Sequence, residues 1–244
     1  MTVPVFLIAG GSRGIGEAVA LSAARAGYFV LLTYLSNKSA ADGVVAGIRG
    51  AGGQAQAVQV DTSIEADIER MFAEADRIGR LAVLVYNSGI TGTPSALVDV
   101  KTATLAHVLQ VNLLGAMIAA RAAVHRMSTS SGGQGGAIVF ISSRAASYGS
   151  PGEHVWYAAS KGGIDSLVIG LAREVAMQGI RVNAVSPGMI ETQIHPPGKL
   201  ENVSKLLPMQ RAGTPAEVAA AVMFLAADTA SYVAGANLAV GGAR

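Results

Sequence analysis

Residues 5–16 read Val-Phe-Leu-Ile-Ala-Gly-Gly-Ser-Arg-Gly-Ile-Gly, an apolar run that ends in a glycine-rich turn. An uninterrupted apolar run of this length is typical of a strand that helices cover on both faces. The Ala-rich segment that follows, 15–26, has the spacing of a helix. A strand, a glycine turn and a helix in this order place free backbone N–H groups where a phosphate binds well. The segment therefore predicts an α/β fold that binds a nucleotide.

The same alternation continues to the end of the chain. Further apolar runs lie at 29–33, 55–60, 82–86, 137–142, 181–186 and 236–240, and helical segments at 64–78, 102–127, 157–177 and 215–227. Because parallel strands need a crossover between them, this order predicts a doubly wound, seven-stranded parallel sheet with helices on both faces. No linker or repeat divides the 244 residues, so we expect a single Rossmann-type domain over 1–244.

The composition excludes several classes of function. Lys and Arg number 18 against 16 acidic residues, without a basic run, so no nucleic-acid partner is expected. The chain has no cysteine, and its four histidines lack ligand spacing, so no metal site is predicted and a reducing compartment fits. We see no signal sequence and no uncharged apolar stretch of about 18 residues. We therefore expect a cytoplasmic protein that makes no membrane contact.

The glycine turn also carries information about the cofactor. Its spacing is G-x-x-x-G-x-G, in which Gly10 permits a tight turn, Gly14 admits a diphosphate and Gly16 allows the helix to pack on the strand. Many NAD-binding folds place an acidic residue about 20 positions onward, on the ribose 2′-hydroxyl. Residues 30–41 contain none.

A 2′-phosphate would instead meet cationic and polar side chains, which favours NADP(H) over NAD(H). The candidates are Arg13, Ser36, Asn37 and Lys38. The alternative is that Arg13 and Lys38 are ordinary solvated cations on the surface.

A second pattern indicates acid–base chemistry. Tyr157 and Lys161 lie four residues apart near the start of an Ala-rich helix, so both project from one face. A neighbouring ammonium lowers the pKa of a phenol toward neutrality. The run at 137–142 delivers Ser142 and Ser143 to the carboxyl edge of the sheet, where open α/β folds bind ligands. Such a Tyr–Lys pair also arises by chance on helix surfaces, so the combination matters more than the pair.

Taken together, these segments resemble the short-chain dehydrogenase/reductases over nearly the whole chain, in particular the NADP-preferring members of the glucose-dehydrogenase and 3-oxoacyl-reductase type. The resemblance rests on the turn at 10–16, Asp61, Asn87-Ser88-Gly89, Asn112, Ser143, Tyr157-x-x-x-Lys161 and Pro187-Gly188-x-x-x-Thr192.

The resemblance implies a catalytic tetrad. Tyr157 would be the general acid/base, Ser143 would bind the carbonyl oxygen, Lys161 would hold the nicotinamide ribose and tune Tyr157, and Asn112 would support a proton-relay water. Ser143 fits better than Ser142 because the family's serine lies at a spacing from the tyrosine that Ser143 matches more closely.

Cofactor contacts, a lid and an assembly are implied as well. The contacts would be Gly10, Ser12, Arg13, Gly14, Ile15, Gly16, Asp61, Thr62, Asn87, Ser88, Gly89, Tyr157, Lys161, Pro187, Gly188, Ile190 and Thr192. Asp61-Thr62-Ser63 is also a plausible helix cap, and Pro187-Gly188 is also a plausible turn. A substrate lid is expected at 193–210, with His195 in it. The family resemblance further implies a homo-oligomer, usually a tetramer, paired through the helices at 102–127 and 157–177.

Two positions depart from the family pattern. Ala9 stands where the family usually has Thr, and Tyr86 where it usually has Asn. In the family the threonine hydroxyl ties the first strand to the fourth, so we hypothesise that Ser88 supplies a replacement hydroxyl. Trp156, beside Tyr157, is either a packing aromatic or a wall of the substrate site.

The function that the sequence favours is hydride transfer between NADP(H) and a small carbonyl or secondary alcohol substrate, as in a carbonyl reductase or a sugar or alcohol dehydrogenase. Two alternatives stay open. One is a 3-oxoacyl-[acyl-carrier-protein] reductase, and the other is a nonenzymatic NADPH-binding sensor or scaffold. The intact tetrad disfavours the last.

Overall fold

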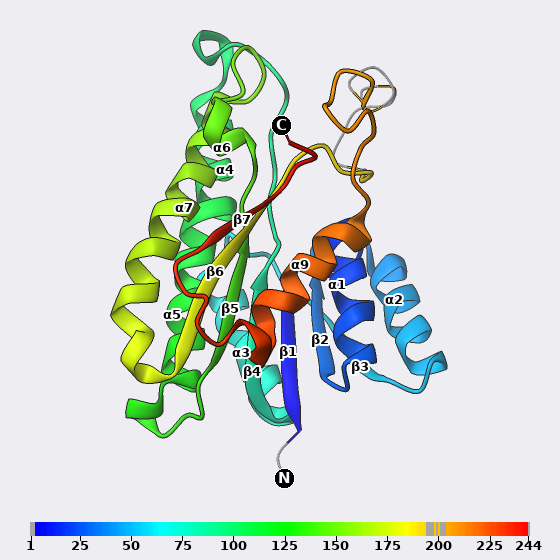
Figure 1. Ribbon diagram of the computed structural model, residues 1–244, viewed down its shortest axis with the longest axis vertical. Coiled ribbons are helices and arrows are strands. Elements are labelled where there is room, and N and C mark those ends of the chain that lie inside the picture. Colours follow the sequence, from blue (N-terminus) through cyan, green and yellow to red (C-terminus); the bar gives the residue numbers. More distant parts are fainter. Residues whose placement is uncertain (1–2, 194–197, 199, 201–203, 244) are drawn as a thin grey trace.

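The computed structural model describes residues 3–193, 198, 200 and 204–243. Its centre is a sheet of seven parallel strands in the order β3-β2-β1-β4-β5-β6-β7 (Figure 1). The strands are β1 (Pro4–Ala9), β2 (Phe29–Tyr34), β3 (Gln54–Gln59), β4 (Arg80–Tyr86), β5 (Gly136–Ile141), β6 (Ile180–Pro187) and β7 (Asn237–Val240). The predicted doubly wound sheet is confirmed. Because the strand order reverses between β1 and β4, the topological switch point lies between these two strands.

Helices cover both faces of the sheet. One face carries α1 (Gly14–Arg25), α2 (Lys38–Gly50) and α9 (Pro215–Ala226), and the other carries α3 (Glu65–Ile78), α5 (Gly115–Met127) and α7 (Val155–Val175). The other helical segments are α4 (Thr102–Leu109), a π-helix (Gln110–Leu114), α6 (Ala145–Tyr148) and short 3₁₀ turns at Leu97–Asp99, Thr129–Ser131, Ala176–Gln178 and Asp228–Ala230. The sequence analysis did not name α2, whose glycines weaken its helical preference.

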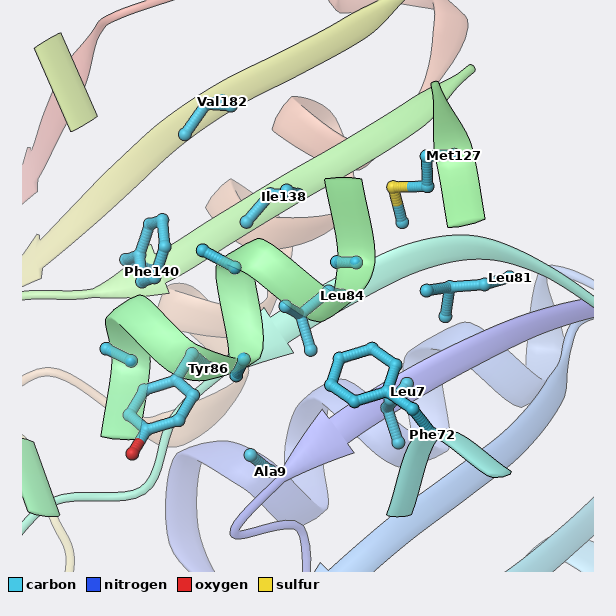
Figure 2. Packing of buried hydrophobic residues seen from close by; sticks show 14 of the residues in the cluster. Leu7, Ala9, Phe72, Leu81, Leu84, Tyr86, Met127, Ile138, Phe140 and Val182 are labelled. Atoms are coloured by element: carbon cyan, nitrogen blue, oxygen red, sulfur yellow. The ribbon is translucent and has the colours of Figure 1, made fainter. Parts of the chain in front are cut away.

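Residues of the central strands alternate between two apolar clusters. Leu7 of β1 belongs to the cluster under α3, α5 and α7, whereas Phe6 and Ile8 belong to the cluster under α1, α2 and α9. Figure 2 shows Leu7 beside Phe72. Burial on both faces explains the continuous apolar runs of the inner strands. The edge strand β3, QAQAVQ, departs from that expectation because it is only partly covered.

The predicted helix at 102–127 is interrupted. A π-helix separates α4 from α5, and the hydroxyl of Tyr86 donates to the carbonyl oxygen of Val111 within it, at 2.6 Å. Tyr86 is 1% exposed, and its ring packs in the core against Phe140 (Figure 2). At Gly115 an added Cβ would lie 2.6 Å from the Tyr86 hydroxyl. The buried tyrosine therefore helps to fix the shape of this interruption, which carries Asn112.

The helical run Thr102–Met127 is also apolar and long enough to cross a membrane by length and composition, which the sequence analysis did not expect. In the fold, however, Ala116, Ala119 and Ala123 of α5 are buried in the cluster beneath the helices. A helix that packs on a sheet meets the same length and composition criterion, so the run is weak evidence for a membrane span.

Removing the Tyr86 hydroxyl should destabilise the fold. Tyr86→Phe retains the ring but leaves the Val111 carbonyl buried without its donor, so we expect the free energy of unfolding to fall by about 1–2 kcal/mol. Urea denaturation followed by circular dichroism measures this. Tyr232→Phe is the matched control, because the Tyr232 side chain is fully exposed. Equal stability of the two variants would show that the buried hydrogen bond contributes nothing.

Candidate functional site

The turn between β1 and α1 needs its glycines. Gly10 and Gly14 have φ angles of 78° and 56°, in the left-handed region that side chains disfavour. Gly16 is required by space, since an added Cβ would lie 2.1 Å from the carbonyl oxygen of Gly10. The turn brings the N-terminus of α1, whose first N–H groups have no partner within the helix, to the carboxyl edge of β1. Such a terminus suits an anion.

Hydrogen bonds tie the turn to its neighbouring strands, but the Ser88 hydroxyl that we hypothesised does not make them. Asn87 donates from Nδ2 to the Gly10 carbonyl at 2.6 Å, and the Gly10 N–H donates to Thr33 Oγ1 at 3.0 Å. Ser88 Oγ lies close to Gly10, 3.1 Å from where a Cβ would stand, but makes no hydrogen bond among the described residues. The Ser88 hypothesis is therefore wrong, because Asn87 and Thr33 make these ties.

A cleft of about 870 Å³ runs along the carboxyl edge of the sheet, beside the switch point between β1 and β4. This is where open α/β sheets bind ligands. The predicted residues that line the cleft are Gly10, Ser12, Arg13, Gly14, Ile15, Asn87, Ser88, Gly89, Ser143, Tyr157, Lys161, Pro187, Gly188, Ile190 and Thr192.

Ser143, Tyr157 and Lys161 come together at one end of this cleft. Tyr157 and Lys161 project from the first turns of α7, and Ser143 follows β5. Lys161 Nζ lies 5.8 Å from the centroid of the Tyr157 ring and donates to the carbonyl of Ile141 at 2.7 Å. A side-chain hydrogen bond joins Ser143 to Tyr157. The group combines a hydroxyl, a phenol and an ammonium facing one cavity.

The pKa values of this group differ from the sequence-based expectation. Burial raises the pKa of Tyr157, although its ring keeps some surface toward the cleft, and the hydrogen bond from Ser143 opposes this shift. The pKa of Tyr157 is therefore not lowered as we expected from its lysine neighbour, because desolvation of the phenol by burial is the largest effect. Burial also lowers the pKa of Lys161 to about 8. Tyr157 is therefore a protonated phenol at neutral pH, able to donate its proton.

Ser142 and Ser143 point to different places. Ser142 is buried, and its Oγ lies 3.2 Å from the Lys161 carbonyl and 2.5 Å from Asp165 Oδ1. Ser143 accepts from the Ala145 N–H at 3.1 Å and keeps its contact with Tyr157. Of the two hydroxyls, only that of Ser143 is placed to meet a molecule beside Tyr157.

Asn112 lies behind the cleft rather than on its wall. Within the π-helix it is fully buried, its Oδ1 accepts from the Ile90 N–H at 2.9 Å, and its Nδ2 donates to the Ile90 carbonyl at 2.9 Å and to Ser160 Oγ at 3.0 Å. Both hydrogens of the amide are used. The side chain thus holds the loop after β4 against α7.

The remaining predicted cofactor residues lie outside the cleft. Asn37 caps α2 by accepting from the Ala40 N–H at 3.0 Å, and Lys38 forms an ion pair with Asp42 at 2.7 Å. Ser36 precedes them on an exposed loop. Arg13 differs, because it lines the cleft and donates to Gln193 Oε1 at 3.3 Å. The cleft therefore presents one of the two predicted cations.

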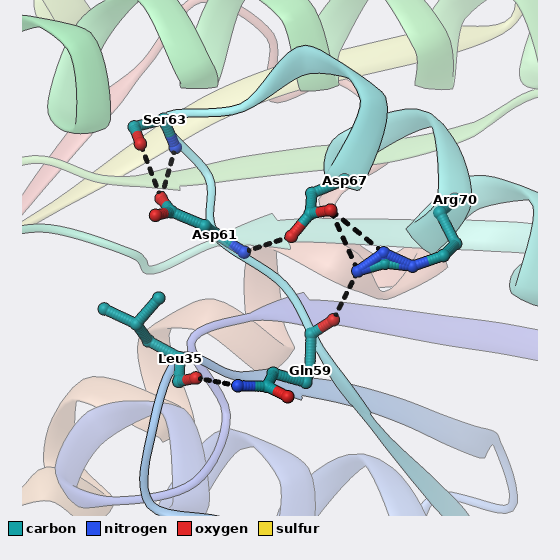
Figure 3. Close-up of polar contacts among 6 residues, drawn as sticks. All are labelled: Leu35, Gln59, Asp61, Ser63, Asp67 and Arg70. Atoms are coloured by element: carbon teal, nitrogen blue, oxygen red, sulfur yellow. Dashed lines mark hydrogen bonds and ion pairs between the residues drawn. The ribbon is translucent and has the colours of Figure 1, made fainter.

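Asp61 is not the helix cap that the sequence allowed, because the N-cap residue of α3 is Ile64 and no side chain caps this helix; Asp61 instead bonds within the loop before it. Its Oδ1 accepts from the N–H and Oγ of Ser63, at 2.9 and 2.6 Å, which lowers the pKa of Asp61 (Figure 3). Asp67 accepts from the Asp61 N–H, and Arg70 links Asp67 to the end of β3. Thr62 is buried beside Tyr86, with a hydrogen bond between their side chains.

The sequence analysis left out several residues of the cleft, which come from the loops after β4, β5 and β6. They are Thr91, Arg144, Ala145, Ser147, Tyr148, Ser150, Pro151, Glu153 and Met189, whereas Gln193, which also lines the cleft, is the first residue of the predicted lid. Their position just after predicted strands was the available signal. Trp156 proves to be a packing residue, since it is buried and donates to the Thr91 carbonyl at 2.7 Å. The predicted lid at 193–210 includes positions outside the described residues, His195 among them.

Known proteins match this chain over nearly its full length. The family model described as enoyl-(acyl carrier protein) reductase matches residues 9–242. The uncharacterised oxidoreductase YgfF of Escherichia coli K12 is 45% identical, over 98% of this chain and 99% of its own. A 3-oxoacyl-[acyl-carrier-protein] reductase of Synechocystis is 36% identical, over 99% and 97%, and glucose 1-dehydrogenase 2 of Bacillus subtilis is 35% identical, over 99% and 95%.

The fold has the same relatives. A short-chain dehydrogenase/reductase from Serratia marcescens superimposes with a TM-score of 0.91 at 30% identity, over 98% of this chain and 97% of that one. A dehydrogenase/reductase from Sinorhizobium meliloti gives the same TM-score at 32% identity, over 99% and 94%. With the parallel sheet, the glycine turn and the cleft that holds Ser143, Tyr157 and Lys161, these matches show that the chain belongs to the short-chain dehydrogenase/reductase family of oxidoreductases.

Proposed function

We propose that this protein transfers a hydride between NADP(H) and a small carbonyl or secondary alcohol substrate. The observation that carries the proposal is the placement of Ser143 and Tyr157 together at one end of a cleft that reaches the N-terminus of α1 at its other end. A reducible carbonyl and a dinucleotide need these two environments within one cavity.

The glycine turn between β1 and α1 has the shape and the hydrogen-bond donors that a dinucleotide needs. The turn keeps Cβ atoms out at Gly10, Gly14 and Gly16, next to the free N–H groups of α1. In our proposal these groups hold the diphosphate, Arg13 meets the 2′-phosphate, and Lys161 holds the nicotinamide ribose. Asn87, Gly89, Pro187, Gly188, Ile190 and Thr192 complete the contacts, while Asp61 and Thr62 shape the adenine end. When bound, the nicotinamide supplies or accepts the hydride.

The chain's own residues then handle the proton. Ser143 Oγ and Tyr157 Oη orient the substrate oxygen, and in the reductive direction the Tyr157 phenol donates its proton to the developing alkoxide. In the oxidative direction the same oxygen accepts that proton. Such a positioned transfer accelerates a reaction by roughly 10²–10⁴-fold. Asn112 serves as a positioning residue, since its amide holds Ile90 and Ser160.

A carbonyl reductase or a sugar or alcohol dehydrogenase is the form we favour. A 3-oxoacyl-[acyl-carrier-protein] reductase is the second candidate, because relatives at 36% and 39% identity bear that name and Arg144 lines the cleft. Turnover of a 3-oxoacyl chain on acyl-carrier protein, compared with the same chain on a short thiol, separates the two. A purely nonenzymatic NADPH-binding role would require that no panel of aldehydes, ketones and sugars is turned over.

We further propose a homo-oligomer acting in the cytoplasm. The helices that the resemblance expects to pair expose large apolar side chains: Leu114 at 43%, Met117 at 40% and Ile169 at 48%. Apolar groups gathered on helix faces favour association. A tetramer is the form that the family resemblance implies.

Tyr157→Phe tests the acid–base assignment. The variant loses the proton donor but keeps the ring, so kcat for carbonyl reduction should fall by roughly 10²–10⁴-fold. The dissociation constant for NADPH, measured by fluorescence titration, should stay near that of the wild type. Retained turnover would remove Tyr157 from the mechanism.

Arg13→Ala tests the cofactor preference. Because only NADPH carries the 2′-phosphate, the loss of this cation should weaken the binding of NADPH more than that of NADH. We expect a difference of about tenfold for one charge-assisted hydrogen bond. Parallel titrations of both cofactors measure it. Lys38→Ala is the matched comparison, since Lys38 lies outside the cleft and is paired with Asp42. Equal weakening of both cofactors by Arg13→Ala would refute the 2′-phosphate contact.

The pH dependence of carbonyl reduction should follow the loss of the proton from Lys161. Its pKa is about 8, whereas that of Tyr157 is raised, so Lys161 is the first of the two groups to lose its proton as the pH rises. We expect kcat/KM for reduction to be level near neutrality and to fall above about pH 8. A profile that stays level to pH 10 would contradict the assignment.

A further inference from the structure

Asp165 lies one helical turn beyond Lys161 on α7, beneath the candidate site. Its Oδ1 accepts from Ser142 Oγ at 2.5 Å and from Asn237 Nδ2 of β7 at 2.8 Å. The carboxylate therefore joins the end of β5, helix α7 and β7. The proposed reaction assigns no role to any of these three side chains.

Lys161, on the same helix, attracts the carboxylate of Asp165. Tyr157, Lys161 and Asp165 follow one another at intervals of four residues, so they share one face of α7. Ser142 ties the pair further, because its Oγ also lies 3.2 Å from the Lys161 carbonyl. The hydrogen bonds thus hold the carboxylate of Asp165 at a fixed place, on a residue one helical turn beyond Lys161.

The ammonium of Lys161 needs such a partner. Lys161 is 3% exposed, and its Nζ donates to the carbonyl of Ile141 and lies under Gly89, where an added Cβ would be 3.4 Å away. Neither contact supplies a negative charge. Burial favours the neutral amine, and attraction by Asp165 opposes that shift in the pKa of Lys161.

The other groups around the pair are neutral or positive. Tyr157 faces Lys161 from α7 as a protonated phenol, and the amide of Asn112 approaches from the π-helix. Arg144, after β5, attracts Asp165, as Lys161 does, while burial raises the pKa of Asp165. Among the charged groups of the described residues, Asp165 is thus the one that favours the protonated form of Lys161.

We propose that Asp165 is a positioning residue that keeps the buried ammonium of Lys161 charged, with Ser142 fixing its carboxylate in place. Only the effect on catalysis rests on the proposed function, because that effect depends on the roles proposed for Lys161 and Tyr157. The interaction itself is a property of the folded chain.

Direct titration of Lys161 tests the proposal without substrate or cofactor. The chain has five lysines, so ¹³Cε-lysine labelling gives a simple NMR spectrum, in which Lys161→Met identifies the Lys161 signal. The Lys161 signal of the wild type should titrate near pH 8. In Asp165→Asn it should titrate about one pH unit lower, since a nearby opposite charge shifts a pKa by about that amount or more.

Two variants distinguish charge from structure. Asp165→Glu retains the charge and should return the midpoint toward the wild-type value. Asn237→Ala removes one hydrogen bond but leaves the carboxylate, and should keep the Lys161 midpoint close to that of the wild type. If Asp165→Asn does not fold, Asp165→Ser takes its place, because its hydroxyl still offers a partner to Asn237.

The outcomes are decisive in both directions. A lowered midpoint in Asp165→Asn, restored by Asp165→Glu, supports the proposal, and the fall of kcat/KM at high pH should then move by the same amount. An unchanged midpoint in the folded Asp165→Asn protein overturns it, as does an equal shift in Asn237→Ala. A lowered midpoint in a protein that turns over no carbonyl compound would sink the proposed function and leave this inference standing.

Discussion

The hydrogen bond from Asn87 to the carbonyl of Gly10 is the contact on which the site depends. It spans 2.6 Å and joins the loop after β4 to the turn after β1, across the point where the strand order reverses. Gly16 lies so close to both groups that any side chain there would displace them. The N-terminus of α1 and the loop that leads to Ile90 are therefore held as one unit. The candidate cofactor cradle and the candidate catalytic end of the cleft share this support.

From that junction the polar network continues inward. Asn112 clamps Ile90 and reaches Ser160, and the π-helix that carries Asn112 is braced from below by the Tyr86 hydroxyl. Tyr86, which stands where the family usually has asparagine, thus makes a buried contact from the end of β4 to the π-helix. Because a buried carbonyl without a donor is costly, this brace constrains the core and the site together.

Many features of the site follow from local order in the chain. The glycine turn, the pair on α7 and the ends of the strands could be predicted, because parallel strands of one sheet bring all their carboxyl ends to one edge. What local order could not predict is where each side chain points. Ser142 and Ser143 are adjacent and chemically alike, yet one bonds Asp165 and the other faces Tyr157, because successive residues at a strand end turn in opposite directions. The same limit explains the wrong hypothesis for Ser88, whose hydroxyl is close to the turn but does not bond it.

The sequence by itself determined the class of fold and the edge at which the site lies, since hydrophobic period and glycine position depend on short-range sterics and burial. Only the tertiary structure decided which of the predicted residues share the cleft, that Asn37 caps α2 whereas Asp61 bonds Ser63 in the loop before α3, and that burial raises the pKa of Tyr157 while it lowers that of Lys161. Those properties depend on atoms brought together from distant parts of the chain. The desolvation of a buried group depends on all the atoms that surround it, so the spacing of residues along the chain cannot predict the resulting pKa shift.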